Sequence, residues 1–334
     1  MKGDIRISVV VPIYNVEPYV ADCLESVGRQ TMAEGVECIL VDDCGGDRSM
    51  ALAEAFVEAY KGDVTFRIIH HERNRGPSAA RNTGVAEARG KYVYFLDSDD
   101  WITPDCLRLL YDAAERSRAD VAIADFEVVG GSDVYIHLKV DGGRVLSKDE
   151  MMHEYAMQRW FPMAANKLCR MDYLKSASLR FREGLVHEDE LWSCEMACTA
   201  SSMIAVREKT YVYRLRHDSI TTSKIDCRRL CCFPIIVEGI ADRIRKSMLQ
   251  SNREACLTFF SVRLFFLNRI MDNDPSFARE CFLQMVRANP FTAWQVMRAI
   301  LAYPRIMANV VYKNIAIGFG FVGLKRRLRA ALGR

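Results

Sequence analysis

Short apolar runs alternate with amphipathic stretches over residues 1–125, and this alternation limits the possible folds more than any other feature of the chain. The apolar runs, at residues 5–11, 36–41, 64–69, 92–96 and 121–124, have the length and composition of strands. The stretches between them repeat apolar residues at helical spacing, first Val20, Leu24 and Val27, then Leu52, Ala55, Phe56 and Ala59. Strands that alternate with helices predict an α/β fold with a mostly parallel sheet.

Polar side chains follow three of these predicted strands at the point where each strand ends. They are Pro12, Tyr14 and Asn15 after the first, Asp42 and Asp43 after the second, and Asp97, Ser98, Asp99 and Asp100 after the fourth. Because open α/β sheets bind ligands at the carboxyl ends of their strands, we expect these residues to form a binding site at one edge of the sheet.

Asp97 and Asp99 are the candidate metal ligands of this edge. Hard divalent cations prefer carboxylate oxygens, and Mg²⁺ or Mn²⁺ held by one or two carboxylates and diphosphate oxygens is common for nucleotide substrates. The alternative role is to cap a helix, but Thr103 followed by Pro104 already predicts a helix start. We therefore favour the metal role.

Two other motifs compete with this interpretation. Residues 95–99 (FLDSD) resemble the aspartate motif of haloacid-dehalogenase-type phosphotransferases, in which the first Asp is a nucleophile. That motif normally ends a first strand, whereas this one ends a fourth. Residues 318–323 (GFGFVG) match the pattern GxGxxG, but no strand–helix–strand unit follows in the eleven residues that remain.

The rest of the chain divides into a mixed middle region and a helical end. Glycine pairs at residues 130–131 and 142–143 predict a polar hairpin-like stretch, and helical patterns follow. Beyond Asp226 the chain is rich in apolar helix formers and has few turn signals. We predict a domain over residues 1–224, with halves at 1–125 and 126–224, and a helical C-terminal region over 225–334.

Charge is distributed unevenly along the chain. From Cys281 onward there is no Asp or Glu, but there are nine basic residues: Arg287, Arg298, Arg305, Lys313, Lys325, Arg326, Arg327, Arg329 and Arg334. Residues 1–280 carry 37 basic and 43 acidic side chains. An acidic body argues against nucleic acid as a partner, and the basic, apolar tail favours an anionic membrane surface. We expect the segment 309–324 to be interfacial, and a core helix with a solvated basic end is the alternative.

Cysteine usage and the first residues both predict a cytoplasmic protein. The twelve cysteines form no CxxC pairs, which favours reduced, apolar roles over disulfides or zinc sites. Charged residues at positions 2, 4 and 6 precede a three-valine run that is too short for the core of a signal peptide. We expect a location in the cytoplasm, peripheral to the inner face of the membrane.

Four motifs in order resemble those of family 2 glycosyltransferases with the GT-A fold, which is Rossmann-like. They lie at residues 10–15 (VVPIYN), 40–43 (LVDD), 74–84 (NRGPSAARNTG) and 95–101 (FLDSDDW). The resemblance continues through residues 165–168 (ANKL), 181–192 (FREGLVHEDELW), 211–214 (YVYR) and 219–221 (SIT), as in bacterial polysaccharide-assembly members, and then fades. One departure is the sequence CGGD at residues 44–47, where the family has a hydroxyl-bearing GSTD.

The resemblance implies roles for the strand-end residues. Tyr14 and Asp42 would hold the base of a nucleotide sugar, Asp97 the ribose or the metal shell, and Asp99 the metal that bridges the diphosphate. A divalent cation neutralises a diphosphate leaving group without proton transfer. Arg81, near the start of a helix that Pro77 and Ser78 open, could face the anionic donor or form an ion pair that orients Asp97 or Asp99.

Glu188 and Asp189 resemble the family's acidic pair, whose Asp is the general base. A sugar hydroxyl is a poor nucleophile and needs a carboxylate to take its proton. Apolar neighbours would raise the pKa of Asp189, although an acidic cluster that stabilises a helix start is the alternative. His217 is a candidate third metal ligand and could equally be structural.

These observations predict an inverting glycosyltransferase that moves a sugar from a nucleotide-diphosphate sugar, with uridine as the default nucleotide, to a hydroxyl of a glycan or lipid-linked acceptor. The alternatives are a catalytically silent scaffold that binds sugar nucleotides or polysaccharide and, third, a phosphotransferase. Asp97, Asp99 and Asp189 together weigh against the scaffold.

Overall fold

The computed structural model describes residues 4–133, 135–216, 226–247, 249 and 252–318. The chain packs as two compact units. The α/β unit comprises Met1–Glu154 and Gln158–Ser223, and the helical unit comprises Tyr155–Met157 and Lys224–Arg334.

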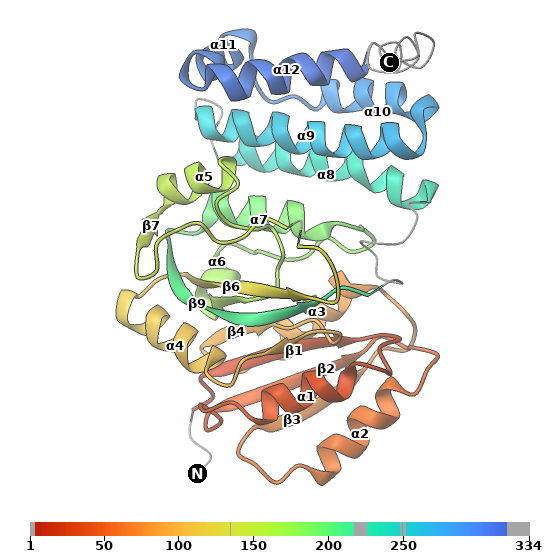
Figure 1. Ribbon diagram of the computed structural model, residues 1–334, viewed down its shortest axis with the longest axis vertical. Coiled ribbons are helices and arrows are strands. Elements are labelled where there is room, and N and C mark those ends of the chain that lie inside the picture. Colours follow the sequence, from red (N-terminus) through yellow and green to blue (C-terminus); the bar gives the residue numbers. More distant parts are fainter. Residues whose placement is uncertain (1–3, 134, 217–225, 248, 250–251, 319–334) are drawn as a thin grey trace. The chain divides into compact units, whose positions relative to one another are not determined.

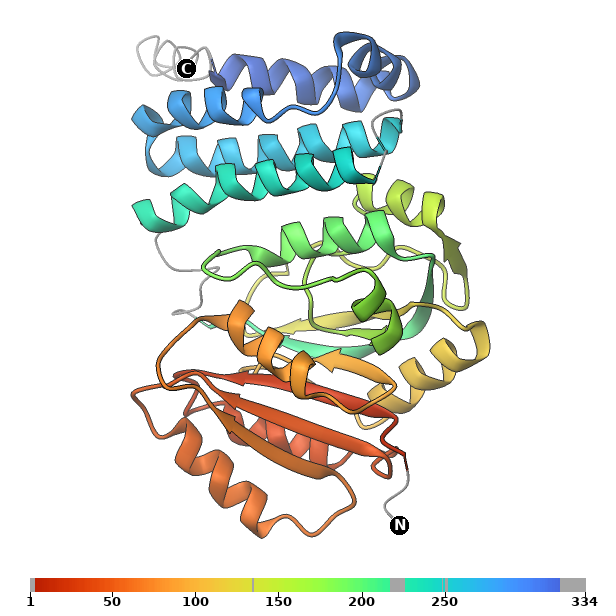
Figure 2. The same cartoon turned by 180° about the vertical axis from the view of Figure 1, so that it is seen from behind.

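Four parallel strands form the first half of the α/β unit. In spatial order they are β3 (Thr65–His70), β2 (Val36–Asp42), β1 (Ile7–Ile13) and β4 (Tyr92–Phe95). The connecting helices are α1 (Val20–Gly28), α2 (Ser49–Ala59) and α3 (Pro77–Glu87), and α1 and α3 cover opposite faces of the sheet (Figures 1 and 2). Coverage on both faces explains why β1 and β2 are almost entirely buried apolar runs.

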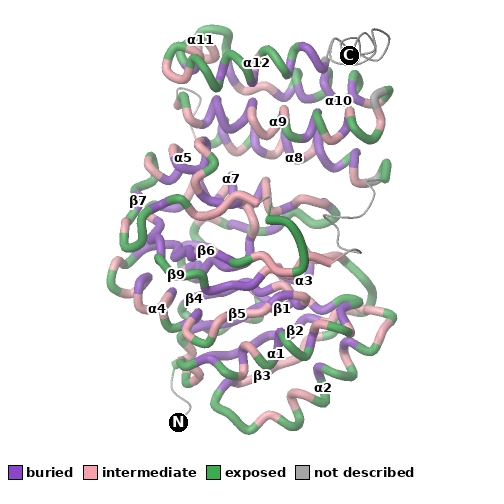
Figure 3. Tube along the Cα trace, viewed as in Figure 1, coloured by how far each residue is buried: buried purple, intermediate pink, exposed green. Residues whose placement is uncertain are grey.

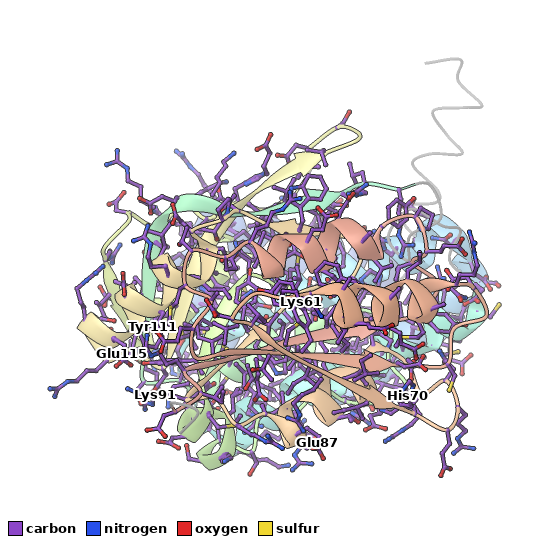
Figure 4. The ribbon with its side chains drawn as sticks, turned by 90° about the horizontal axis from the view of Figure 1, so that it is seen from below. Lys61, His70, Glu87, Lys91, Tyr111 and Glu115 are labelled. Atoms are coloured by element: carbon purple, nitrogen blue, oxygen red, sulfur yellow. The ribbon has the colours of Figure 1, made fainter. Side chains whose placement is uncertain are left out.

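The parallel arrangement confirms the predicted α/β fold and brings the strand ends to one edge. Figure 4 shows His70, at the end of β3, at the opposite side of the sheet from Lys91, which precedes β4. Lys91 pairs there with Glu115 of α4 (Cys106–Ser117), with 2.6 Å between Nζ and Oε1. The candidate site residues that follow β1, β2 and β4 therefore lie on the His70 side.

Beyond β4 the sheet continues with mainly antiparallel pairs. β8 (Lys167–Arg170) pairs with β4, β6 (Val121–Val129) with β8, and β9 (Ser202–Arg214) lies parallel to β6. The short strands β5 (Trp101–Ile102) and β7 (Val145–Ser147) both pair with β9, which completes a nine-stranded sheet among the described residues. The helices of this half are α4, α5 (Lys148–Ala156), α6 (Met171–Ser176) and α7 (Glu188–Thr199).

Three local predictions were wrong. The stretch between the glycine pairs is no hairpin, because β7 pairs with β9 and not with β6. Thr103 does not cap a helix, because α4 begins at Cys106 and its N-cap residue is Asp105. The backbone N–H of Thr103 donates to the carbonyl of Thr210. Leu52, Ala55 and Ala59 of α2 are exposed; α2 instead buries Ser49 and Ala53 and packs Phe56 against Tyr60 and Phe66.

The helical unit contains α8 (Cys227–Lys246), α9 (Arg253–Asn273), α10 (Pro275–Arg287), α11 (Ala293–Ala302) and α12 (Pro304–Gly318). α9 packs against the other four, and Phe233 of α8 stacks on Phe266 of α9 with 4.5 Å between ring centroids. These helices confirm the predicted helical C-terminal region. None of the described helices is long and apolar enough to cross a membrane.

α12 corrects part of the interfacial prediction for residues 309–324. Its Asn314 is buried, accepts a hydrogen bond from Arg263 Nε at 2.7 Å and donates to the carbonyl of Phe260 at 3.1 Å. Val310 and Ile317 are buried as well. Residues 309–318 therefore pack one face into the helical core, and the basic tail over 319–334 lies outside the described residues.

Candidate active site

Arg81 joins two distant parts of the chain at the carboxyl edge of the sheet. Its Nη2 donates to Asp97 Oδ1 at 2.8 Å and its Nη1 to Glu188 Oε1 at 2.7 Å, while Asp189 Oδ1 lies 3.8 Å from Nη1. Burial alone would lower the pKa of Arg81, but the three carboxylates outweigh it and raise the pKa above its ordinary value. Of the two ion pairs that the sequence suggested, Arg81 makes the one with Asp97.

Two features hold the first turns of α3, the helix that carries Arg81. Gly76, with φ of 86°, precedes Pro77 at the first helical position. Asn82 exchanges two hydrogen bonds with the backbone of Phe181, at 2.8 and 3.0 Å. Phe181 in turn stacks on Trp192 of α7, with 4.9 Å between ring centroids. These contacts hold α3 against the segment that leads into α7.

Asp189 lies in the first turn of α7, directly after Glu188 and after His187, whose φ is 65°. Burial is the main cause that raises the pKa of Asp189 to about 7, and the charges of Glu188 and Asp97 add to it. Arg81 and Lys167 act in the opposite direction. A carboxylate with a pKa near neutrality is suited to take a proton from a hydroxyl, and the role of Asp189 as the general base stays a prediction.

Lys167 of β8 is a buried cation that the sequence reasoning did not assign to the site. Its Nζ donates to the carbonyls of Phe161 and Met163 and lies 4.3 Å from the centroid of the Phe161 ring. Burial lowers the pKa of Lys167 to about 7, against the opposing charge of Asp189. The motif ANKL contained Lys167, but only the fold brings its charge near α7.

The turn after β4 is held by Asp100. This buried carboxylate accepts hydrogen bonds from Tyr211 Oη at 2.5 Å and from the backbone N–H of Arg214 at 2.7 Å. Burial and the charges of Asp99 and Asp97 raise the pKa of Asp100 well above its usual range. Asp100 was predicted only as one of the strand-end residues of the binding site, and the structure shows that it ties the turn to the end of β9.

Asp99 faces a cation from the same end of β9. Arg216 Nε lies 2.8 Å from Asp99 Oδ2, and both side chains are largely buried. Burial, followed by the charge of Asp97, raises the pKa of Asp99, and Arg216 opposes this shift. The predicted metal ligands Asp97 and Asp99 are therefore close enough to interact but pair with different arginines.

Asp43 organises the loop that leads into α3. Its carboxylate accepts hydrogen bonds from the N–H groups of Arg75 and Gly76 at 2.8 and 2.7 Å, from Asn74 Nδ2 at 3.0 Å and from His71 Nδ1 at 2.7 Å. Asp43 and His71 are both buried. With its oxygens engaged in this way, Asp43 sets the position of the loop, and direct contact with a donor stays a prediction.

The other predicted donor-binding residues lie at the same edge. Tyr14 is 46% exposed after β1, and Asn15, with φ of 50°, accepts a hydrogen bond from the N–H of Gly46. Asp42 accepts from the N–H of Cys44 and from His70 Nδ1, each at 2.9 Å. Pro12 pairs with Val41 inside the sheet, and Ser98 is buried in the turn after β4.

Comparison with known proteins identifies the family. Residues 8–176 match the family model described as glycosyl transferase family 2. The chain is also 30% identical to glycosyltransferase GlyG of Streptococcus pneumoniae over 80% of its own length and 87% of that protein. The chain belongs to glycosyltransferase family 2.

Other relatives of this family 2 glycosyltransferase are bacterial as well. It is 33% identical to the uncharacterized glycosyltransferase EpsJ of Bacillus subtilis over 64% of its length, and it spans 62% of EpsJ. Membership in family 2 overturns the phosphotransferase alternative for residues 95–99, and it agrees with the resemblance seen in the motifs.

Solved structures share the fold. Staphylococcus aureus TarS 1–349 in complex with UDP-GlcNAc matches with a TM-score of 0.70 at 20% identity, over 94% of this chain and 89% of that one. The mannosyltransferase PcManGT from Pyrobaculum calidifontis, in complex with GDP-Man and Mn²⁺, matches with a TM-score of 0.51 at 13% identity, over 93% and 86%. Both confirm the predicted GT-A architecture.

Asp97 and Asp99 of this glycosyltransferase have the donor chemistry that a divalent cation needs. Each offers hard carboxylate oxygens. Burial is the main cause that raises the pKa of Asp99 and the charge of Asp97 adds to it, and a bound cation would offset this negative charge. The described residues contain no cluster of three or more His, Cys, Asp or Glu side chains that could hold a metal ion. Two carboxylates are a usual number of protein ligands where phosphate oxygens of a substrate complete the shell of Mg²⁺. His217, the third predicted ligand, lies outside the described residues.

Proposed function

We propose that this protein is an inverting glycosyltransferase that transfers a sugar from a uridine-diphosphate sugar to a hydroxyl of a glycan or lipid-linked glycan in surface polysaccharide synthesis. The observation that carries the proposal is the ion-pair cluster around Arg81, which joins donor-side Asp97 to Glu188 and lies next to Asp189. The bound nucleotide sugar named for TarS and the polysaccharide functions named for relatives such as succinoglycan biosynthesis protein ExoO support the substrate class.

In the proposed reaction Asp189 is the base. The acceptor oxygen attacks the anomeric carbon as its proton moves to a carboxylate oxygen of Asp189, and the bond from that carbon to the diphosphate oxygen breaks. A single displacement of this kind inverts the configuration at the anomeric carbon. The pKa of about 7 makes Asp189 a competent proton acceptor near neutral pH. Glu188 is the second candidate because it lies next to Asp189 in the first turn of α7, although its carboxylate is already engaged by Arg81.

The donor would lie along the carboxyl ends of β1, β2 and β4. Exposed Tyr14 offers a ring for base stacking, and Pro12, Asn15, Asp42, Asp43 and Ser98 shape the surrounding edge. Arg81 holds Asp97 in place and adds positive charge near the diphosphate. Asp97 and Asp99, with His217 as a further candidate, would hold Mn²⁺ or Mg²⁺, which neutralises charge on the leaving diphosphate when bound.

Different parts of the chain would bind the donor, the acceptor and the membrane. We assign residues 1–125 to nucleotide-sugar binding, 126–224 to acceptor binding and 225–334 to a helical region that places the enzyme near its acceptor. The nine basic residues after Cys281 would associate with the anionic cytoplasmic face of the inner membrane. A lipid-linked acceptor would be presented at that surface.

A panel of nucleotide sugars tests the proposal. The full chain is incubated with Mn²⁺ or Mg²⁺, each nucleotide sugar and a glycan acceptor, and release of the nucleoside diphosphate is measured. Acceptor-dependent release from a uridine-diphosphate sugar is expected. Binding of donors without release, in the presence of a range of acceptors, would instead favour the catalytically silent scaffold.

A further inference from the structure

α11 exposes an apolar face that the core of the helical unit does not use. Eight of its ten residues are apolar, yet only Ala299 is buried. Trp294 is 62% exposed, Met297 44% and Leu301 73%. Positions 294, 297 and 301 lie on one face of a helix, so these three side chains form one apolar surface. A contiguous exposed apolar surface is a candidate site of interaction with a partner or a membrane.

The helix beneath this surface is firmly anchored. Thr292 and Gln295 form a capping box at the start of α11, and Phe291 is buried against Phe259 of α9. Within the helical unit, α11 and α12 lie on the far side of α9 from α8 (Figures 1 and 2). Figure 3 shows the exposed stretches of α11 at this outer side of the unit.

The charges that α11 and α12 contribute to this surface have one sign. Arg298 lies on the same face of α11 as Trp294 and Leu301, and it is exposed. The neighbouring helix α12 exposes Arg305 and Lys313 beside Tyr312. Between Cys281 and Gly318 the chain has no Asp or Glu, so no acidic side chain of these helices offsets the cations.

This charge distinguishes between the possible occupants. A symmetric contact between two copies would bring the same face onto itself and set Arg298 and its basic neighbours against each other. An anionic lipid surface instead offers opposite charge to the arginines and an apolar phase to Trp, Met and Leu, and Trp is favoured at that boundary.

We propose that the face of α11 formed by Trp294, Met297, Arg298 and Leu301 docks on an anionic lipid surface and inserts its apolar side chains. The inference extends the membrane association proposed for the tail to a second surface of stated residues. It does not depend on sugar transfer, so it can be tested apart from the catalytic proposal.

The test compares full-length variants on vesicles of equal parts phosphatidylcholine and phosphatidylglycerol. Met297→Ser with Leu301→Ser is expected to weaken co-sedimentation by at least about tenfold, because two large apolar side chains no longer leave water. Leu52→Ser, on the exposed face of α2 and 38% exposed, is the matched control and should leave co-sedimentation unchanged. Lipids with brominated acyl chains should quench the tryptophan fluorescence of the parent protein, and this quenching should be lost in Trp294→Phe.

Three results would overturn the inference. The double variant could bind like the parent, while replacement of Lys325, Arg326, Arg327 and Arg329 by Gln removes binding; the tail would then be the sole contact. Brominated lipids could quench the parent and Trp294→Phe equally. The double variant could lose self-association in sedimentation experiments and keep its vesicle binding, which would assign the face to a second copy. Circular dichroism and uridine diphosphate binding check that each variant is folded.

Discussion

Asp189 and Glu190 both lie in the first turn of α7. Substitutions at the two positions therefore test whether Asp189 is the general base or only an acidic charge that stabilises the start of the helix. We expect Asp189→Asn to leave donor affinity nearly unchanged and to lower turnover by about 10²-fold or more, as when a positioned base is neutralised. Glu190→Gln removes a charge from the same turn and should retain most of the activity. Titration calorimetry with the donor and initial rates supply the two measurements.

The raised pKa of Asp189 also predicts how stability depends on pH. The folded protein holds this proton up to about pH 7, whereas the unfolded chain releases it near the ordinary value for Asp. The folded state thus binds more protons in this window, and Asp189 lowers the free energy of unfolding as pH rises through it. Asp189→Asn should flatten that decline in urea denaturation. Equal slopes, or near-normal turnover, would place the base elsewhere, with Glu188 the first candidate.

Asp99 tests the proposed metal shell. Asp99→Ala removes a largely buried carboxylate that pairs with Arg216 and takes no volume from the apolar core, and circular dichroism checks that the variant is folded. We expect metal-dependent binding of uridine diphosphate and turnover both to be lost. Titration with uridine diphosphate, with and without Mn²⁺, measures the effect. Unchanged binding with Mn²⁺ would remove Asp99 from the metal shell.

Arg81 is the residue whose loss should damage both stability and binding. Arg81→Met leaves Asp97 and Glu188 without their shared cation in a buried site, a change that typically costs about 3–5 kcal/mol. Arg48→Met is the control, because Arg48 is exposed and pairs with Glu17 at the surface, where solvent screening leaves an ion pair little effect on stability. Urea denaturation compares them, and equal losses would contradict the central place of Arg81.

At the scale of elements, the loop between β3 and α3 depends on a single carboxylate. Asp43→Ala leaves the N–H groups of Arg75 and Gly76 without their acceptor, and we expect a loss of about 1–3 kcal/mol together with weaker donor binding, because Arg81 follows this loop. Asp105→Ala, at an exposed Asp that bonds Thr31 and Arg108, should cost less. Hydrogen exchange of residues 74–82 shows whether the loop has loosened, and unchanged exchange would argue against this role.

The sequence predicted most of the elements that carry the site because strand periodicity and the residues after each strand are local properties. The buried face of α2 was mispredicted because a distant aromatic group, Phe66 of β3, draws Phe56 and Tyr60 inward. The contacts that Lys167 and Asp100 make were missed for a similar reason. Their roles depend on contacts with Phe161 and Tyr211, which no local pattern reveals.

At the scale of the whole molecule, the prediction concerns the basic tail. The full chain should float with anionic liposomes at low salt and less at high salt, because screening weakens attraction between the tail and the lipid. A chain that ends at Gly318 should float less but keep the contribution of the α11 face. Equal flotation of the two chains would show that the tail does not bind lipid.

The truncation is placed at Gly318 because α12 ends there. A shorter truncation product, ending near Tyr303, would lose α12 with Asn314 and would leave Arg263 buried without this hydrogen-bond partner. Such a chain would lose membrane binding and helical packing together, and its failure to float would say nothing specific about the tail.

The Arg81 cluster and the pairing of β4 with β8 also have a consequence for synthesis on the ribosome. Residues 1–125 emerge first and contain the parallel strands, but one edge of β4 has no partner until residues 167–170 follow. The ion pair between Arg81 and Asp97 can likewise form early, whereas the pair between Arg81 and Glu188 can form only after residue 188 has been synthesised. The nascent first half therefore carries an open edge and an incomplete charge cluster over roughly seventy to ninety residues of translation, counted from Asp97. Chaperone contact with the nascent chain should concentrate in that interval.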